Sequence, residues 1–240
     1  MMYSKIIACF IIAFLSVNTL SAQEKPNMLS KQDERQGWKL LFNGKNLEGW
    51  TAVGKNDPPA TGWVIQDGIL MNKKVGEEHG SDIITKDEYG DFDLSVDFKL
   101  SEGGNSGIKY LFTKYDQGGW LGLEYQILDN DKHPDAKNGR NGNRLQATLY
   151  DLLPLEKQVP NRVGEWNHAR IVVKGSKVIH YLNGVKVLSF DRDSEAYKEA
   201  WKLSKFKDTQ PPFGAVKKGH ILLQDHGDQV AFKNIKVKIL

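Results

Sequence analysis

The chain has 240 residues, of which 26% are charged and 40% hydrophobic, and its formal net charge is +3 at pH 7. Positive and negative side chains are interleaved, with no block of one sign and no basic stripe, which excludes nucleic acid as the expected partner. The single cysteine, Cys9, lies near the start of the chain. A mature exported form would therefore depend on its hydrophobic core rather than on disulfides.

Residues 1–22 have the features of a signal peptide. Lys5 forms a short basic region, residues 6–17 are apolar but too few to span a bilayer, and small residues close the segment. We therefore expect an exported protein, in the periplasm or at the cell surface of a Gram-negative bacterium, without a membrane segment after processing. Residues 23–36 are polar and aperiodic and are expected to form a tether. Residues 37–240 are expected to form a single domain.

Apolar residues at every second position predict β-strands along most of the chain. The clearest strand is 91–100, whose two faces are cleanly apolar and polar. The dipeptides Asp67-Gly68 and Asn183-Gly184 each lie between two apolar runs and predict type I′ hairpin turns. Further strands are predicted over 38–42, 62–71, 106–112, 121–128, 145–150, 166–175, 177–182, 185–190, 220–225 and 229–239.

Only residues 194–206 have the composition of a helix, with Asp193 or Ser194 as a plausible N-cap. Ten or more short strands with Gly-rich turns and one short helix predict an all-β fold in which two antiparallel sheets pack face to face. In such a sandwich the outer face of one sheet can curve into a groove, which is a common place for a ligand.

The strand predicted over 121–128 presents polar side chains on one face. Tyr125 and Ile127 are expected to point into the core, which places Glu124 and Gln126 on the outer face. By the same alternation in the strand before it, Lys109 lies on that outer face. An ordinary solvated sheet face would show the same pattern.

Three other segments carry polar side chains that could contribute to a site. Gly107 removes side-chain bulk where another group can approach the backbone. The predicted strand 145–150 and the residues before it supply Arg144, Gln146 and Tyr150, and the C-terminal segment places Gln224 on one side with His226.

The histidines give weaker signals. His168, His180 and His220 lie in or beside predicted strands and are expected to be structural, and His79 lies in a polar loop. His133 and His226 stand among carboxylates and amides.

The loop after the strand 121–128 also raises the question of a metal. It is not an EF-hand, because Pro134 and Arg140 occupy the positions that need Gly and Glu. The spacing leaves open a divalent metal ion bound by His133 and a carboxylate. The sequence contains no motif for binding a nucleotide, nicotinamide or flavin.

Seven segments occur in the order found in one family. Together they resemble the 3-keto-disaccharide hydrolase domain family, over about residues 37–240. The resemblance implies a concanavalin A-like jelly roll in an exported bacterial protein, and the cleavage of 3-keto-glycosides or 3-keto-disaccharides. The segments are 41–50, 63–70, 104–110, 123–129, 164–175, 180–184 and 221–238.

A 3-keto group acidifies the proton on C2, so a base can remove it and the group on C1 can leave by β-elimination, after which water adds. This chemistry needs a base, a cation or hydrogen-bond donor for the enolate oxygen, and an acid for the leaving group. It does not need the two carboxylates of ordinary glycosidases. The resemblance also implies a partner that makes the substrate, a sugar 3-dehydrogenase, since no nicotinamide or flavin motif is present.

Carried onto this chain, the resemblance assigns Glu124 as the base, Lys109 as the enolate-stabilising cation and His226 as the acid or a metal ligand. Many relatives have an arginine where this chain has Leu111, and positions 109 and 111 are expected to share a strand face, so that Lys109 replaces that cation. The substrate-binding groups are expected to be Asn105, Gln126, Asp129, Arg144, Tyr150 and Gln224.

Two other functions fit the same fold. A non-catalytic, lectin-like module would use Trp50, Tyr115 and Trp120 as stacking platforms for sugar rings. A conventional glycosidase would place two carboxylates on one strand face, whereas this chain has Gln126 where the second acid would stand.

Overall fold

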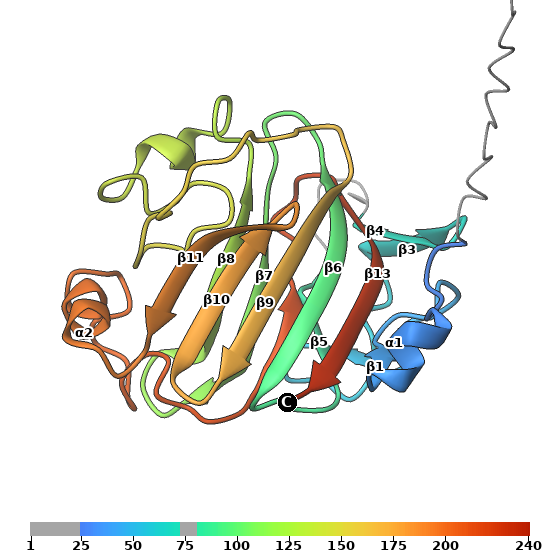
Figure 1. Cartoon of the computed structure of the whole chain (residues 1–240), viewed down its shortest axis with the longest axis horizontal. Helices are drawn as coiled ribbons and strands as arrows, with labels where there is room; N and C mark the ends of the chain where they lie inside the picture. Colours follow the sequence, from blue (N-terminus) through green and yellow to red (C-terminus); the bar gives the residue numbers. More distant parts are fainter. Residues whose placement is uncertain (1–24, 73–80) are drawn as a thin grey trace, which may run out of the picture.

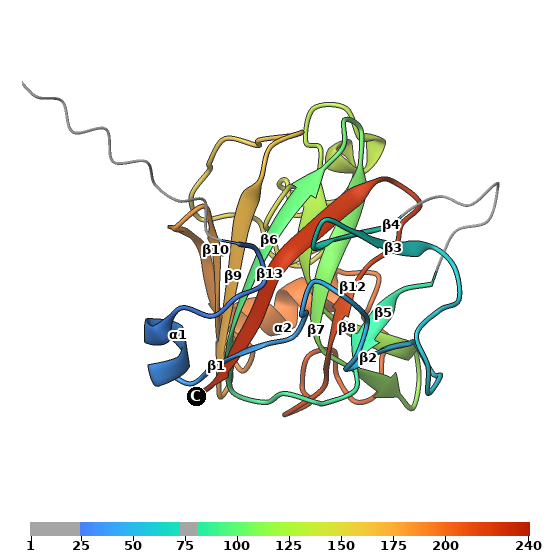
Figure 2. The same ribbon diagram turned by 90° about the vertical axis from the view of Figure 1, so that its right-hand side faces the viewer.

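A computed structural model describes residues 25–72 and 81–240 as two antiparallel sheets packed face to face (Figures 1 and 2). The larger sheet has eight strands in the order β11-β10-β9-β6-β13-β4-β3, with β1 paired to β13. Its strands are β1 (Trp38–Leu40), β3 (Trp63–Gln66), β4 (Ile69–Asn72), β6 (Phe92–Leu100), β9 (Asn167–Lys174), β10 (Lys177–Leu182), β11 (Val185–Asp191) and β13 (Val230–Ile239).

The smaller sheet has five strands in the order β2-β5-β12-β7-β8. It lies behind the larger sheet in the view of Figure 1. Its strands are β2 (Trp50–Ala52), β5 (Ile83–Thr85), β7 (Asn105–Tyr115), β8 (Gly119–Leu128) and β12 (His220–Leu223). The predicted two-sheet sandwich is therefore confirmed, while the predicted signal peptide and His79 lie outside the described residues.

The hydrophobic core lies between the two sheets. From the smaller sheet, Ile108, Tyr110, Tyr125 and Ile127 point inward and are fully buried, as their alternation predicted. The larger sheet contributes the apolar face of β6, which is also buried. Because these inward residues fix the register of β7 and β8, they also decide which side chains stand on the outer face.

Both predicted hairpin turns are present. Asp67 and Gly68 have φ values of 52° and 76°, and Asn183 and Gly184 have φ values of 50° and 79°. Two consecutive positive φ values are the mark of a type I′ turn, which matches the twist of the paired strands. The first turn joins β3 to β4 and the second joins β10 to β11.

The strand predicted over 145–150 is not formed. Ala147 and Asp151 adopt positive φ values of 67° and 61°, which interrupt an extended strand. The segment instead makes turns beside β8 and is hydrogen-bonded to it around the isolated bridge between Tyr125 and Leu149. Its compact path brings residues 143–151 over the edge of the smaller sheet.

The helical content also differs from the prediction. Helix α2 (Glu195–Lys202) begins at its N-cap Ser194 as expected but ends four residues before 206. The structure also contains a short 3-10 helix η1 (Pro134–Lys137). None of the helices in the described part of the chain is long and apolar enough to cross a membrane.

The described part of the expected tether, residues 25–36, is docked on the domain. It contains the short helix α1 (Lys31–Arg35), which Ser30 caps. Asn27 is buried, and its backbone N–H donates to Asn234 Oδ1 at 2.7 Å while its side chain donates to the carbonyl of Gly68. The polar sequence of this segment did not predict its docking, because its hydrogen-bond partners lie in distant parts of the sequence.

His180 is a buried structural histidine in the core. Its Nδ1 lies 3.0 Å from the carbonyl oxygen of Ala147, and its Nε2 lies 2.8 Å from the hydroxyl of Tyr110. Because a carbonyl can only accept, Nδ1 carries the hydrogen and Nε2 accepts from the tyrosine. Burial lowers the pKa of His180 from 6.5 to about 4.

This histidine predicts a pH-dependent stability. Between pH 6.5 and about 4, His180 is protonated in the unfolded chain but not in the folded chain. Lowering the pH across this range therefore decreases the free energy of unfolding by about 3 kcal/mol. Urea unfolding followed across this range should show a shallower pH dependence for His180→Gln than for the unsubstituted protein. An identical dependence in the two proteins would contradict the assignment.

Candidate active site

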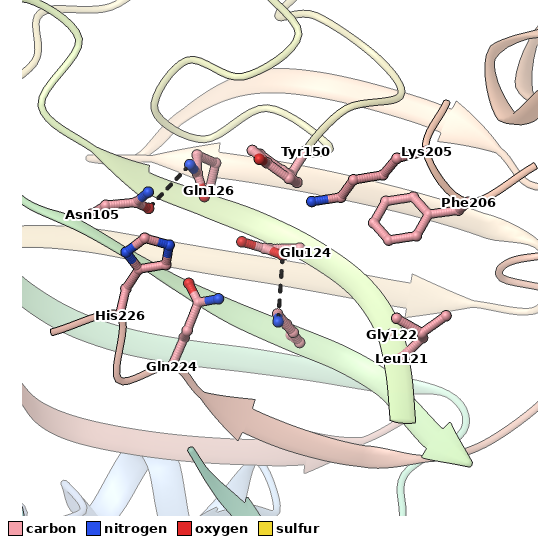
Figure 3. Close-up of a pocket in the computed structure, with 11 residues that line it drawn as sticks. Asn105, Leu121, Gly122, Glu124, Gln126, Tyr150, Lys205, Phe206, Gln224 and His226 are labelled. Atoms are coloured by element: carbon pink, nitrogen blue, oxygen red, sulfur yellow. Dashed lines mark hydrogen bonds and ion pairs between the residues drawn. The ribbon is translucent and has the colours of Figure 1, made fainter. Parts of the chain in front are cut away.

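A cavity of about 210 Å³ opens on the outer face of the smaller sheet (Figure 3). The cavity is lined by Asn105, Lys109, Leu121, Gly122, Glu124, Gln126, Tyr150, Lys205, Phe206, Gln224 and His226.

Glu124 lies at the centre of the cavity, and only 8% of the residue is exposed. Lys109 stands directly opposite it in the register of β7 and β8, with its Nζ 3.7 Å from Glu124 Oε2. Burial raises the pKa of Glu124 above its ordinary value, and the positive charges of Lys109 and Lys205 oppose this rise. A partly desolvated carboxylate of this kind suits proton abstraction.

Gly107 leaves the space that the Glu124 carboxylate occupies. A Cβ atom added at Gly107 would stand 2.7 Å from Glu124 Oε1, closer than a side chain can approach without a shift. Gly107 faces Gln126 in the neighbouring strand, so the empty position lies beside Glu124 on the outer face. The expectation that Gly107 allows another group to approach is confirmed, and that group is the candidate base.

Amide side chains form the other polar part of the cavity. Gln126 Nε2 lies 3.3 Å from Asn105 Oδ1. A half-turn of the Gln126 amide instead lets its nitrogen donate to Glu124 Oε1 at 3.0 Å and to the carbonyl of Ser106 at 3.1 Å. The Oε1 atom of Gln224 is buried without a hydrogen-bond partner among the described residues. These amides can exchange donors and acceptors with sugar hydroxyl groups.

The expectation that residues 109 and 111 share a strand face is wrong. Leu111 has a φ of 49°, and the pairing of β7 with β8 shifts after Tyr110, so a bulge turns Leu111 into the core. Gly122 lines the cavity across from this bulge, where an added Cβ would stand 2.8 Å from the Cα of Phe112. The expectation that Lys109 replaces a cation at position 111 therefore loses its argument from a shared strand face.

The second cation of the cavity is Lys205, which the sequence did not single out. It follows helix α2 in the segment predicted to be helical, and it reaches the cavity together with Phe206. Its Nζ lies over the ring of Tyr150, 4.4 Å from the centroid. Desolvation lowers the pKa of Lys205, against the opposing negative charges of Glu124 and Asp151.

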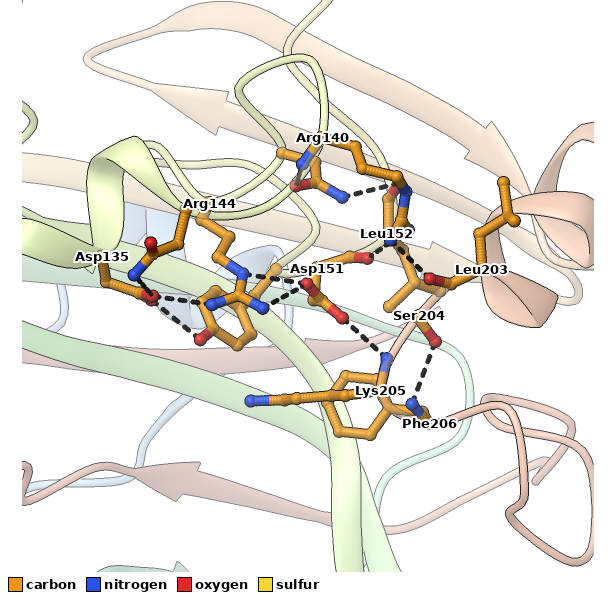
Figure 4. Close-up of polar contacts among 12 residues, drawn as sticks. Asp135, Arg140, Arg144, Asp151, Leu152, Leu203, Ser204, Lys205 and Phe206 are labelled. Carbon is orange, nitrogen blue, oxygen red and sulfur yellow. Dashed lines mark hydrogen bonds and ion pairs between the residues drawn. The ribbon is translucent and has the colours of Figure 1, made fainter.

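A chain of charged contacts supports the wall that carries Lys205 (Figure 4). The backbone N–H of Lys205 donates to Asp151 Oδ2 at 2.8 Å. Arg144 bridges Asp151 Oδ1, through Nε at 2.9 Å, and Asp135 Oδ1, through Nη1 at 2.7 Å. Tyr150 donates its hydroxyl to the same Asp135. Burial would raise the pKa of Asp135, but the hydrogen bonds from Arg144 and Tyr150 outweigh it and hold the pKa below its ordinary value.

Two residues expected to bind substrate have structural partners instead and do not line the cavity. Arg144 is occupied by the two carboxylates described above and supports the wall from behind. Asp129 is buried and accepts hydrogen bonds from the backbone N–H groups of Gly103, Asp131 and Lys132. Asn105, Gln126, Tyr150 and Gln224 are brought together as expected.

His226 lies at the rim of the cavity and is exposed to solvent. Its ring is 6.2 Å from that of His133, whose Nε2 is 4.0 Å from Asp228 Oδ2. In residues 25–72 and 81–240, no three His, Cys, Asp or Glu side chains cluster closely enough to hold a metal ion. Among the described residues, no third side chain of these types joins His133 and Asp228.

The carboxylate Asp82 lies close enough to interact with the charges of Lys109 and His226 without lining the cavity. Burial raises the pKa of Asp82, and the positive charge of Lys109 opposes the rise. Its Oδ1 accepts a hydrogen bond from the backbone N–H of Asp225 at 2.9 Å. Among the described residues that line the cavity, Glu124 is the one carboxylic acid.

The proposed stacking platforms are mostly unavailable. Trp50 is fully buried, with its indole N–H donating to the carbonyl of Leu41, and Tyr115 is 2% exposed in the core. Trp120 is partly exposed but stacks on Phe112, with ring centroids 5.7 Å apart. Two of the three aromatic residues thus serve the core rather than a sugar-binding surface.

A two-sheet sandwich with a polar cavity around a carboxylate, two lysines and several amides fits a carbohydrate-active protein. Comparisons with known proteins specify it further. Residues 37–238 match the family described as 3-keto-alpha-glucoside-1,2-lyase-like domain. The chain belongs to this family.

Individual relatives agree with the family assignment. The chain is 38% identical to a 3-keto-disaccharide hydrolase of Bacteroides thetaiotaomicron, over 86% of this chain and 80% of that protein. A crystal structure of a Parabacteroides distasonis protein described as a glycosyl hydrolase superposes with a TM-score of 0.78, at 33% identity, covering 90% of this chain and all of that one. A second such structure from the same organism gives 0.64, at 32% identity, covering 85% and 99% of the two chains. The protein is therefore a glycoside-cleaving enzyme.

The fit between Gly107 and Glu124 predicts the effect of one added methyl group. Gly107→Ala should displace the carboxylate and lower the rate of glycoside cleavage by about 10²-fold, as a misplacement of roughly 1 Å does, while the protein remains folded. The measurement is kcat together with a thermal unfolding curve.

The control is Gly164→Ala, where an added methyl group meets nothing within 4 Å. This variant should lose stability, because its φ of 77° disfavours alanine, but it should keep the rate per folded molecule. Equal rates for Gly107→Ala and the unsubstituted protein would show that Glu124 does not depend on this space.

Proposed function

We propose that this enzyme cleaves 3-keto-glycosides, including 3-keto-disaccharides, by removing the C2 proton, eliminating the group on C1 and hydrating the product. The observation that carries the proposal is the pairing of the buried carboxylate Glu124 with the ammonium group of Lys109 in a cavity with no second lining acid among the described residues. Conventional glycosidases use two carboxylates, whereas elimination needs one base and a positive charge.

The steps follow the geometry of the cavity. Glu124 takes the proton from C2, and the electron pair moves toward the C3 oxygen, where a positive charge stabilises it. The enolate then forms the C1–C2 double bond and breaks the bond between C1 and the leaving oxygen. That oxygen receives a proton from His226 or from water, and addition of water across the double bond completes a net hydrolysis.

The polar part of the cavity supplies the contacts that would orient the substrate. Asn105, Gln126 and Gln224 present amide groups on the same side of Glu124 as His226 (Figure 3). The unpartnered Gln224 Oε1 can accept a hydrogen bond from a sugar hydroxyl. Burial of such polar groups favours a ligand that replaces their hydrogen bonds to water.

The names of the relatives support the same chemistry. The family description refers to a 1,2-lyase, which is elimination across C1 and C2, and the Bacteroides relative is named a hydrolase. Elimination is the reaction of a lyase, and addition of water to its product makes the net reaction a hydrolysis, so both names fit the proposed mechanism. A sugar 3-dehydrogenase is the partner that this function requires, because the substrate must first be oxidised at C3.

Substitution of the base gives the direct test. Glu124→Gln should lower the release of aglycone from a 3-keto-glucoside by about 10² to 10⁴-fold, the usual contribution of a general base. The unoxidised parent glucoside should not be cleaved by either protein. A parallel assay with a chelator tests a contribution from a metal ion. Full turnover by Glu124→Gln would exclude Glu124 as the base.

The pKa of Glu124 predicts the acid side of the pH profile. The base acts when ionised, so the rate should fall as pH is lowered through a pKa that burial has raised above the ordinary 4.5. Lys109→Met removes a charge that opposes this rise, so the acid limb of kcat/KM should move to higher pH. An acid limb that stays in place, or moves to lower pH, would contradict the coupling of Lys109 to Glu124.

A further inference from the structure

The two lysines that line the cavity differ in their resting partners. Lys109 is paired with Glu124 across neighbouring strands, and its charge is already used to hold that carboxylate in a buried place. Lys205 is an exposed residue, and its ammonium group at the cavity forms no hydrogen bond or ion pair with any residue of the described ranges, 25–72 and 81–240. Its Nζ lies over two aromatic rings, 4.4 Å from the centroid of Tyr150 and 5.2 Å from the centroid of Phe206.

The backbone that carries Lys205 is fixed although its ammonium group is free. Asp151 accepts the backbone N–H of Lys205, and the indole N–H of Trp201 donates to the carbonyl of Phe206 at 2.7 Å. The ring of Phe206 stacks on Phe213 with centroids 4.2 Å apart and an interplanar angle of 5°. These contacts on both sides hold the segment against the cavity, as a precise site requires.

A cation without a partner has more to gain in the transition state than one that is already paired. Catalysis depends on interactions that are stronger in the transition state than in the ground state. Lys109 would divide its charge between Glu124 and a developing oxyanion. As Glu124 takes up the C2 proton, the negative charge leaves the carboxylate and appears on the substrate oxygen, beside the free cation.

We propose that Lys205 is a catalytic residue of this enzyme, which binds the C3 oxygen as negative charge develops there, while Lys109 holds Glu124. The proposal rests on the proposed function and specifies its electrostatic part. In this step the C2–H bond breaks, its proton goes to Glu124, and the electron pair is delocalised onto the C3 oxygen next to the Lys205 ammonium. Return of that pair forms the C1–C2 double bond and expels the leaving oxygen.

This assignment is distinct from a role of Lys205 as the acid for the leaving group. The enolate forms before the C1–O bond is broken, so enolate stabilisation can be measured with a substrate that has no leaving group. A 3-keto-1,5-anhydrohexitol has a hydrogen in place of the exocyclic oxygen substituent on C1 and keeps only the ring oxygen there. In D₂O it can exchange its C2 hydrogen through the same enolate, but it has no aglycone to release.

The experiment compares this C2 exchange, followed by NMR, with aglycone release from 3-keto-glucosides of good and poor leaving groups. Lys205→Met should lower both exchange and release by about 10² to 10³-fold, the usual effect of removing one oxyanion donor. Lys205→Arg should restore part of both rates. The matched control is Lys207→Met, which removes a lysine of the same segment that is exposed like Lys205 but does not line the cavity, and it should leave both rates unchanged.

Two outcomes would overturn the proposal. Unchanged exchange and release in Lys205→Met would show that the ammonium has no part in the reaction. Unchanged exchange with lost release of only the poor leaving group would make Lys205 the acid instead. If Lys205→Met no longer melts cooperatively, its lost activity has a structural reason and Lys205→Arg decides instead. A folded Lys205→Arg protein that recovers exchange supports the proposal, and one that recovers neither rate contradicts it. If the unsubstituted enzyme neither exchanges nor cleaves 3-keto sugars, the proposed function itself fails.

Discussion

The site depends on the cost of burying one carboxylate. Glu124 is 8% exposed, and a buried charge is tolerated only where cations and hydrogen bonds compensate for the lost water. Lys109 supplies the nearest positive charge from the neighbouring strand, and Gly107 supplies the space. The compensation is incomplete, because burial still raises the pKa of Glu124. This remaining imbalance gives the carboxylate a higher proton affinity than an exposed one.

The sheet sets the positions of these groups more precisely than loops could. Pairing of β7 with β8 places Lys109 opposite Glu124, and the buried faces of both strands prevent the register from slipping. The bulge at Leu111 then ends the regular polar face, and Gly122 opposite it leaves the cavity open. An irregularity of the strand and two glycines therefore shape the cavity as much as the residues that face the substrate do.

The wall opposite the sheet is built in a different way. Its residues come from two segments far apart in the sequence, 143–151 and 203–206. Asp151 joins them by accepting the backbone N–H of Lys205, and Arg144 holds Asp151 in place from within the first segment. Buried charged networks of this kind are stable when each member has its partner. This network holds the backbone of Lys205, whose exposed ammonium group has no ion-pair partner among residues 25–72 and 81–240. The sheet thus provides the base with its counter-charge, and the wall provides a second charge.

The sequence by itself determined the sandwich, the two type I′ turns and the outward position of Lys109, Glu124 and Gln126, because alternation and Asn-Gly or Asp-Gly pairs are local signals. It did not determine the bulge at Leu111, since a leucine at positive φ has no local signature. Nor did it reveal Lys205, which lies 81 positions from Glu124 in the chain, or the use of Arg144 and Asp129 as structural partners. Only the tertiary structure decided these, because side-chain partners across long sequence separations are chosen by the packing of the whole domain.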